Sequence, residues 1–264
     1  MIDELLVAPD TPDGIGRRNA RNGDLLSVSV SSAIALSRQA NLLSSGSAGL
    51  DSILGGGYEE GKITEAFGAS NTGKTQLAFQ AAVMASARGW KSVFVDTEST
   101  FRPERIEDIA RARGLDAKAA LESVFAVRAR DVQDQVQVLA RMGNDSRVSS
   151  AKLVVVDTVS KNFSLEFPDR ERVGKRQSAL GVYLNGVARD AFLHRRTVIL
   201  TNRVASVTRD GETRDINLGG LTLQRFVSKS VRMERRGSTV YASLVGAPDE
   251  GKQVALRILE RGFD

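Results

Sequence analysis

Short apolar runs alternate with longer amphipathic stretches along most of the chain, from about Gly46 onward. In the last two runs, KLVVVD and TVILTN, apolar residues follow one another without polar residues between them. Such runs are typical of parallel strands that helices cover on both faces. The sequence therefore predicts an α/β fold with a mostly parallel sheet covered by helices. Strands are expected over residues 62–67, 91–96, 123–127, 152–157 and 197–202, and helices over about 74–88, after Pro103, from about Asp131 and before residue 197.

The pattern changes to a period of two near the end of the chain. In SVRMERRGSTVYASLVG, residues 230–246, apolar and polar residues alternate on either side of RRGS. This predicts an antiparallel hairpin that extends the sheet at its C-terminal side. The first 43 residues differ, because Pro, Gly and Asn interrupt them and no period is evident. We therefore expect an N-terminal arm or linker, residues 1–43, and one core domain, residues 44–264.

The stretch FGASNTGKTQ, residues 67–76, joins the first expected strand to the first expected helix. It fits the phosphate-binding pattern G-x-x-x-x-G-K-[ST] in the strand–loop–helix context that this pattern requires. Glycines let backbone N–H groups surround phosphate oxygens, and the helix start adds partial positive charge. A glycine-rich turn without a ligand is the alternative. We predict that ATP is held by Gly68, Ala69, Ser70, Asn71, Thr72, Gly73, Lys74 and Thr75, with Lys74 on the β- and γ-phosphates and Thr75 on Mg²⁺.

Two carboxylates are candidates for the chemistry of the predicted P-loop NTPase. Asp157 ends the apolar strand KLVVVD, where an acid would approach Mg²⁺ from the carboxyl edge of the sheet. Glu98, in VDTEST, follows the neighbouring strand and could polarise the water that attacks the γ-phosphate. The alternatives are a turn-forming Asp157 and a surface Glu98. Hydrolysis requires both roles, an acid that holds the metal and a separate base.

Composition excludes several other kinds of chemistry. The 264 residues include no cysteine and a single histidine, His194, which excludes a disulfide framework and disfavours a zinc or haem site. No apolar run reaches the roughly 18 residues that span a bilayer, and the opening MIDELLVAPD is acidic where a secretory signal is basic. We expect a globular protein with a cytoplasmic, nucleoid-associated location and no membrane partner.

Positive charge is concentrated in the C-terminal half of the chain. The formal net charge is +5, and residues 161–236 hold 16 Lys and Arg against 8 Asp and Glu, a net of +8. The rest of the chain is therefore net negative. A concentrated basic surface is expected of a protein that binds a polyanion. The alternative is a solvated, arginine-rich surface without a partner.

VFVDTESTFRPERIEDIARARGL, residues 93–115, together with FGASNTGKTQ and LVVVDTVS, resembles the ATPase core of the RecA/RadA recombinase superfamily. The resemblance covers residues 44–263 and is closest to the archaeal and eukaryotic branch, including the archaeal RadB-type paralogues. It implies a RecA-like core, DNA recombination and repair as the function, and ATP and Mg²⁺ as cofactors. It also implies that Glu98 and Lys74 are catalytic.

The resemblance also implies roles for residues outside the phosphate loop. Arg105 resembles the arginine that lies against adenine, and Gln76 resembles a residue beside the α-phosphate. Pro248, in GAPDEGK, resembles the segment that caps the nucleotide of a neighbouring protomer. FPDRERVGKRQ, residues 167–177, resembles the first DNA-binding loop, and residues 203–220 occupy the place of the second. The implied DNA-binding residues are Arg170, Arg172, Lys175, Arg176, Arg203, Arg209 and Arg214.

The chain departs from the family pattern at four places. The 40-residue arm is too short for the N-terminal helix-hairpin-helix domain of the active recombinases. At the expected Phe-x-x-Ala hook the chain has VSSA, so that Val30 replaces Phe and self-association is expected to be weakened. Arg203 replaces the glutamine that links the γ-phosphate to the second loop, and arginine cannot accept a hydrogen bond. Ser99 replaces the glycine after the catalytic glutamate.

Three functions are compatible with these observations. The preferred one is a RadB-type recombination accessory protein, a weak DNA-dependent ATPase that binds single- or double-stranded DNA and assists the main recombinase or another repair protein, with at most weak homo-oligomers. The second is a strand-exchange recombinase that forms filaments. The third is an ATP-regulated signalling protein of the wider superfamily that does not bind DNA.

Overall fold

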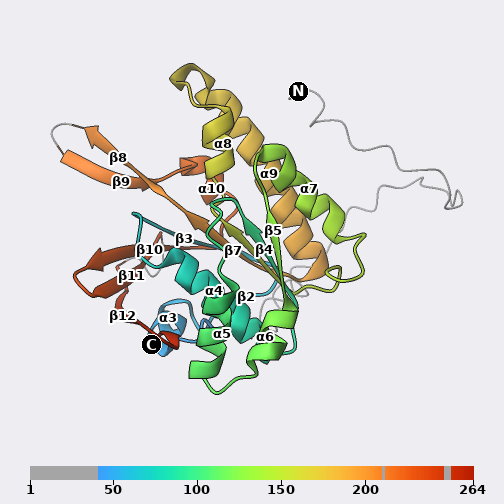
Figure 1. The fold of residues 1–264 in the computed structure, drawn as a ribbon. Coiled ribbons are helices and arrows are strands. Elements are labelled where there is room, and N and C mark those ends of the chain that lie inside the picture. The colour runs from blue at the N-terminus through green and yellow to red at the C-terminus, as the bar shows by residue number, and fades with distance from the viewer. Residues whose placement is uncertain (1–40, 210–211, 247–250) are drawn as a thin grey trace, which may run out of the picture. The chain divides into compact units, whose positions relative to one another are not determined.

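The computed structural model describes residues 41–209, 212–246 and 251–264. Its centre is a nine-stranded sheet, and Figure 1 shows helices packed on both faces of it. Across the sheet the strands are β13 (Gly262–Phe263), β12 (Gln253–Leu259), β11 (Thr239–Val245), β10 (Lys229–Arg236), β3 (Ile63–Gly68), β7 (Thr197–Asn202), β6 (Leu153–Asp157), β4 (Ser92–Asp96) and β5 (Val124–Arg128).

The six strands from β10 to β5 are parallel, and β11, β12 and β13 add to them in antiparallel fashion. Every residue of β3, β4, β6 and β7 is buried, which explains why their sequences show little alternation. The hairpin predicted over residues 230–246 is formed by β10 and β11. The predicted fold class, a mostly parallel sheet covered by helices with a C-terminal antiparallel extension, is therefore confirmed.

Two hydrophobic cores lie on opposite faces of the sheet, each under its own set of helices. The first core includes Phe79 and Phe94, whose rings stack with centroids 5.3 Å apart. The second includes Phe163 and Tyr183. The first is covered by α3 (Ala48–Ile53), α4 (Lys74–Ala87), α5 (Pro103–Ala112) and α6 (Ala117–Ser123), and the second by α7 (Val132–Met142), α8 (Lys161–Glu166), α9 (Val173–His194) and α10 (Gly220–Gln224).

The two segments expected to be DNA-binding loops form regular secondary structure. The first forms a 3₁₀ turn, Arg170–Arg172, and then enters α9, so that Lys175 and Arg176 lie on a helix. The second forms two paired strands, β8 (Val204–Arg209) and β9 (Glu212–Asn217). The Asp-Gly pair, with Val207 and Thr208 before it and Thr213 and Ile216 after it, favours such a hairpin and was the missed signal.

Several other elements were also missed, most of them short. A two-stranded sheet pairs β1 (Leu42–Leu43) with β2 (Tyr58–Glu59), and α3, α6, α8, α10, β12 and β13 had no predicted counterpart. Residues 1–40, which contain most of the expected arm and Val30, lie outside the described part of the chain. In the part that is described, no helix is both long and apolar enough to cross a membrane.

Candidate nucleotide site

The glycine-rich loop lies between β3 and α4, as the sequence predicts. Gly73 precedes α4 with a φ of 90°, and Asn71 has a φ of 63°. A Cβ atom at Gly68 would lie 2.2 Å from the carbonyl oxygen of Met233, and one at Gly73 would lie 2.6 Å from the ring of Phe263. The loop is thus shaped by close backbone approach, which glycine alone permits. Ala69, Ser70 and Asn71 are exposed at its outer side, whereas Thr72 is buried.

Lys74 is buried, and its ammonium group lies under this loop. Its Nζ donates hydrogen bonds to the carbonyl oxygens of Gly68 at 2.9 Å and Ala69 at 2.6 Å. Burial lowers the pKa of Lys74, and the charge of Arg203 acts in the same direction, whereas Asp157 and Glu98 oppose the shift. The four charged groups are therefore close enough to influence one another.

Asp157 and Thr75 form the part of the site that fits Mg²⁺. The Thr75 hydroxyl donates to Oδ2 of Asp157 at 2.8 Å, and the Thr201 hydroxyl donates to Oδ1. Burial raises the pKa of Asp157, and these two hydrogen bonds oppose that shift. In the described residues no group of three or more His, Cys, Asp or Glu side chains is arranged to hold a metal. One carboxylate and one hydroxyl suit Mg²⁺, which commonly completes its shell with water and phosphate oxygens.

Glu98 lies in a loop that Asp96 organises. The carboxylate of Asp96 accepts hydrogen bonds from four successive backbone N–H groups, those of residues 98–101, at 2.8–3.3 Å. Within this loop Ser99 has a φ of 63°, where glycine is favoured. Serine in this conformation costs about 1–2 kcal/mol, which gives a physical reason for the glycine of the family pattern. Sequence analysis missed Asp96, although an Asp directly after a buried strand is the available signal.

The Glu98 carboxylate has a protein partner on each oxygen. Oε1 accepts a hydrogen bond from the Thr158 hydroxyl at 3.1 Å, and Oε2 forms an ion pair with the guanidinium group of Arg203. The side chain of Arg203 is 49% exposed, and that of Glu98 is 13% exposed. The resemblance implies a DNA-binding role for Arg203, which stays a prediction; in the structure its guanidinium group pairs with Glu98.

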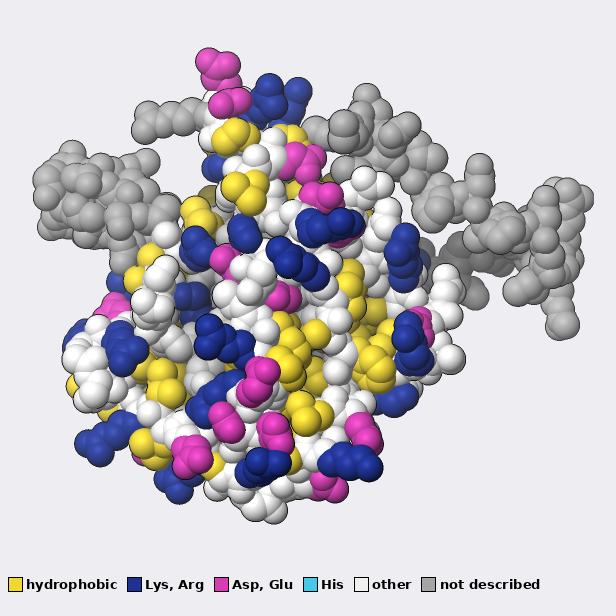
Figure 2. All heavy atoms as spheres, in the orientation of Figure 1, with side chains coloured by type: hydrophobic (Ala, Val, Ile, Leu, Met, Phe, Trp, Pro, Cys, Tyr) yellow, Lys and Arg dark blue, Asp and Glu magenta, His cyan; other side chains and the backbone are white. Residues whose placement is uncertain are grey.

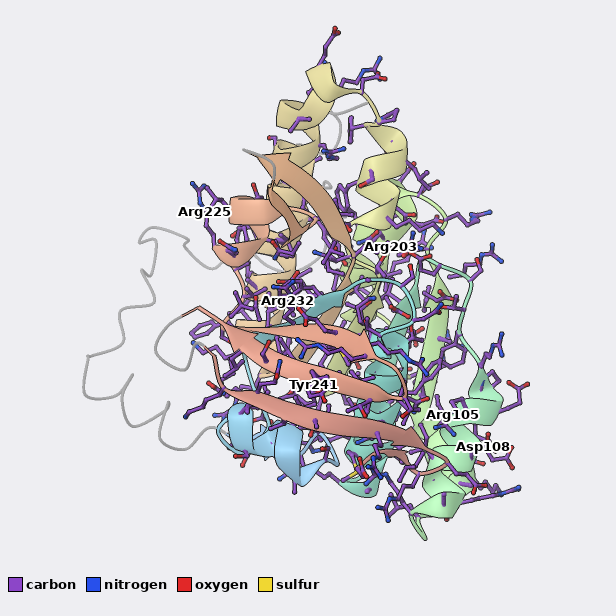
Figure 3. The ribbon with its side chains drawn as sticks, turned by 90° about the vertical axis from the view of Figure 1, so that its left-hand side faces the viewer. Arg105, Asp108, Arg203, Arg225, Arg232 and Tyr241 are labelled. Atoms are coloured by element: carbon purple, nitrogen blue, oxygen red, sulfur yellow. The ribbon has the colours of Figure 1, made fainter. Side chains whose placement is uncertain are left out.

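Arg105 lies at the other end of the site, beside the C-terminal strands, as Figure 3 shows. Its Nε donates to Oε1 of Gln76 at 2.7 Å, and its two terminal nitrogens donate to the carbonyl oxygens of Leu259 and Glu260. The guanidinium plane is thus held at its edges. Nε2 of Gln76 is buried and has no hydrogen-bond partner in the described residues. A buried donor without a partner is costly, and a phosphate oxygen would satisfy it.

Two of the basic residues expected to bind DNA contact protein groups close to them in the sequence. Arg176 donates to the carbonyl oxygen of Phe167 at 3.3 Å, and Arg172 forms an ion pair with Asp169 at 3.4 Å. Figure 2 shows Lys and Arg side chains spread over the visible face with Asp and Glu among them. Pro248 and the side chains of Arg170, Arg209 and Arg214 lie outside the described part of the chain.

A buried carboxylate joins the hairpin to the sheet. Glu65 of β3 is fully buried and accepts hydrogen bonds from Asn202 at 2.8 Å, Asn217 at 2.9 Å and Ser230 at 3.0 Å. Burial raises the pKa of Glu65, and these hydrogen bonds oppose that shift. The network connects β3, β7, β9 and β10, so it anchors the base of the hairpin. An acid in the middle of the predicted strand KITEAF was the missed signal.

A groove of about 770 Å³ lies beside β5, at the open edge of the sheet. Its apolar lining includes Phe125, Val138 and Met142, and its rim carries arginines such as Arg128 and Arg141. An exposed strand edge next to a groove can accept an extended segment. The sequence analysis did not predict this feature.

Comparison with known proteins agrees with this geometry. The model of the Rad51 family matches residues 37–225, which is more than half of the chain. The DNA repair and recombination protein RadA of Aeropyrum pernix is 36% identical over 224 residues, which cover 80% of this chain and 70% of that protein. The matched region contains the phosphate loop, Glu98, Asp157 and Arg203. The chain belongs to the Rad51 family, within the RecA/RadA recombinase superfamily.

Proposed function

We propose that the protein is a recombination accessory protein that binds ATP, Mg²⁺ and DNA and hydrolyses ATP slowly. The observation that carries this proposal is the cluster of Lys74, Thr75, Asp157 and Glu98 at one edge of the sheet, with Glu98 paired to Arg203. The RadA of Aeropyrum pernix is named for DNA repair and recombination, and membership of the same family supports a role in these processes.

Each residue of the cluster has a distinct role in this proposal. Lys74 turns its ammonium group from the loop carbonyls to the β- and γ-phosphates. Thr75 and Asp157 would hold Mg²⁺, which, when bound, neutralises charge on the phosphates. Glu98 accepts a proton from the water that attacks the γ-phosphorus, and the electrons of the broken P–O bond remain on ADP. Arg105, held at its edges, presents a flat face to adenine.

Slow turnover follows from the contacts of Glu98. Both carboxylate oxygens of Glu98 already have protein partners, Thr158 and Arg203, so neither oxygen is free to orient the attacking water. Arg203 cannot accept a hydrogen bond from the attacking water, unlike the glutamine of the family pattern. The protein is therefore expected to hold ATP without hydrolysing it for longer than an efficient ATPase does.

Single-stranded DNA is expected to raise the ATPase rate only slightly. The protein is expected to form at most small oligomers in solution. The test is ATP turnover with and without single-stranded DNA, with particle mass measured by light scattering in the same samples. Strong stimulation by DNA together with long filaments in electron micrographs would favour a strand-exchange recombinase and contradict the accessory role.

Replacement of both Arg170 and Arg176 by glutamine is expected to weaken DNA binding. The logarithm of DNA affinity falls as the logarithm of salt concentration rises. Loss of two phosphate contacts makes this fall shallower, because it reduces the magnitude of the slope by about 1.4 for single-stranded DNA. The measurement is a salt titration of DNA affinity with ATP present. The matched control is the replacement of both Arg128 and Arg141 by glutamine. These two arginines are exposed and lie outside the basic segment, so the slope is expected to stay unchanged. If the wild-type protein does not bind DNA at low salt, the signalling alternative gains support.

A further inference from the structure

Residues 258–263, which join β12 to β13, form a segment that lies beside the nucleotide site. Ile258 pairs with Phe263 and Leu259 pairs with Gly262, so the chain makes a tight turn between the two strands. Figure 1 shows this end of the chain next to α3 and α5. Phe263 is fully buried in the first hydrophobic core, which fixes the segment to the body of the protein. We call residues 258–263 the turn segment.

A buried glutamine of α4 holds the backbone of Phe263. Oε1 of Gln80 accepts a hydrogen bond from the Phe263 N–H at 2.5 Å, and Nε2 donates to the Phe263 carbonyl oxygen at 3.3 Å and to that of Ser45 at 2.7 Å. Arg113 donates to the same Phe263 oxygen at 3.0 Å. Gly262 has a φ of 94°, and a Cβ atom there would collide with Oε1 of Gln80. Both polar backbone groups of Phe263 are thus bonded to side chains, which fixes the position of its ring.

The ring of Phe263 lies against Gly73 of the phosphate loop. A Cβ atom at Gly73 would lie 2.6 Å from Cζ of Phe263 and 3.1 Å from Cδ1 of Ile258. Gly73 precedes α4 with a φ of 90°, and successive backbone N–H groups of such a loop form a concave site for an anion. Because protein interiors are close-packed, side chains in contact with Gly73 limit the conformations that this residue can adopt.

The turn segment also holds the arginine at the other end of the site. Nη1 of Arg105 donates to the carbonyl oxygen of Glu260 at 2.8 Å, and Nη2 donates to that of Leu259 at 2.7 Å. One segment of six residues therefore contacts both Gly73, on the phosphate side, and Arg105, which the proposed function places on adenine. None of the segment's own residues has a role on the nucleotide in that proposal.

We propose that the turn segment positions both ends of the nucleotide site, and that Phe263 is a positioning residue for phosphate binding that acts through Gly73. The ring keeps Gly73 in the conformation that turns its N–H toward the phosphates. The carbonyl oxygens of Leu259 and Glu260 keep the face of Arg105 turned to the base. Because coupling between two sites is reciprocal, a bound nucleotide in turn stabilises the turn segment. This inference rests on the proposed function, since it requires a nucleotide in the phosphate loop.

The first test measures the affinities of ADP and of a non-hydrolysable ATP analogue, both with Mg²⁺, in the wild type and in Phe263→Leu. Leucine keeps the position apolar but lacks the ring atom Cζ that lies next to Gly73. Both affinities are expected to fall about tenfold, the effect of one lost hydrogen bond to a charged group. Phe163→Leu is the matched control, because Phe163 is also buried but lies in the second core. It is expected to lower the thermal unfolding temperature by a similar amount and to leave both affinities unchanged.

The second test needs no variant and follows amide hydrogen exchange in the wild type. ADP is expected to slow exchange of the Phe263 N–H, which bonds to Gln80, by a larger factor than that of the Ala151 N–H. Ala151 lies in a buried turn at the second core and reports the general stabilisation that any ligand gives.

Equal slowing of these two amides would overturn the positioning role. So would wild-type affinities in a folded Phe263→Leu, or an equal loss of affinity in Phe263→Leu and Phe163→Leu. Failure of the wild type to bind either nucleotide would instead overturn the proposed function.

Discussion

Replacement of Lys74 by alanine is expected to weaken ATP binding by about 100-fold. Lys74 is the cation beneath the phosphate loop, where its Nζ lies 2.9 Å from the Gly68 oxygen and 2.6 Å from the Ala69 oxygen. Two charge-assisted hydrogen bonds to phosphate contribute about 3 kcal/mol together, which corresponds to a factor of about 100 in affinity. The measurement is the equilibrium dissociation constant of ATP with Mg²⁺.

The matched control for this variant is Lys118→Ala, because the side chain of Lys118 is 83% exposed and lies on α6. It removes the same charge without touching the loop, so its ATP affinity is expected to equal that of the wild type. Thermal unfolding of both variants shows whether the fold persists. A Lys74→Ala protein that is folded and binds ATP with wild-type affinity would contradict the assignment of residues 67–76 as the nucleotide loop.

Replacement of Glu98 by glutamine is expected to reduce ATP turnover by about 10²–10⁴-fold, the usual contribution of a general base. Glutamine occupies nearly the same volume but cannot take a proton from water at neutral pH. ATP affinity is expected to remain at least as high, because the change removes a negative charge near the phosphates and releases Arg203. Single-turnover kinetics with bound ATP separate the two effects.

Glu122→Gln serves as the control for this second variant, since Glu122 is an exposed glutamate at the end of α6 whose partner is Lys118. It is expected to turn over ATP at the wild-type rate. Unchanged turnover in Glu98→Gln would remove Glu98 from the chemistry. Weaker ATP binding in Glu98→Gln would instead contradict the expectation that the negative charge of Glu98 opposes the binding of the phosphates.

Sequence reasoning located the elements whose signals are local. The run KLVVVD is mostly apolar, which is evident without any knowledge of the neighbouring strands. The corresponding strand β6, Leu153–Asp157, is buried on both faces. The phosphate loop is recognisable because its glycines, Lys74 and Thr75 lie within a few consecutive residues. The sequence shows that Ser99 replaces the glycine of the family pattern. The conformational free energy that this replacement costs is evident only from the backbone, where Ser99 has a φ of 63°, a value that favours glycine.

Contacts between distant segments were not predictable in this way. Arg203 and Glu98 are 105 positions apart, and Glu65 and Ser230 are 165 positions apart. Arg105 is held by carbonyl oxygens of the C-terminal strands, about 150 residues further along the chain. Nothing in the spacing of these residues indicates that they meet, because the order of the strands in the sheet decides it.

By itself, the amino-acid sequence determined the α/β class and the place of the glycine-rich loop between a strand and a helix, since hydrophobic periodicity and short motifs are properties of neighbouring residues. Its assignment of this loop to ATP and of Asp157 and Glu98 to the chemistry stays a prediction. The tertiary structure alone decided that Arg203 lies on Glu98 and that the basic second segment is a paired hairpin anchored on Glu65. The physical reason is that β7 inserts between β3 and β6, which brings the residue after Asn202 to the edge where the proposed catalytic groups, which follow three other strands, meet.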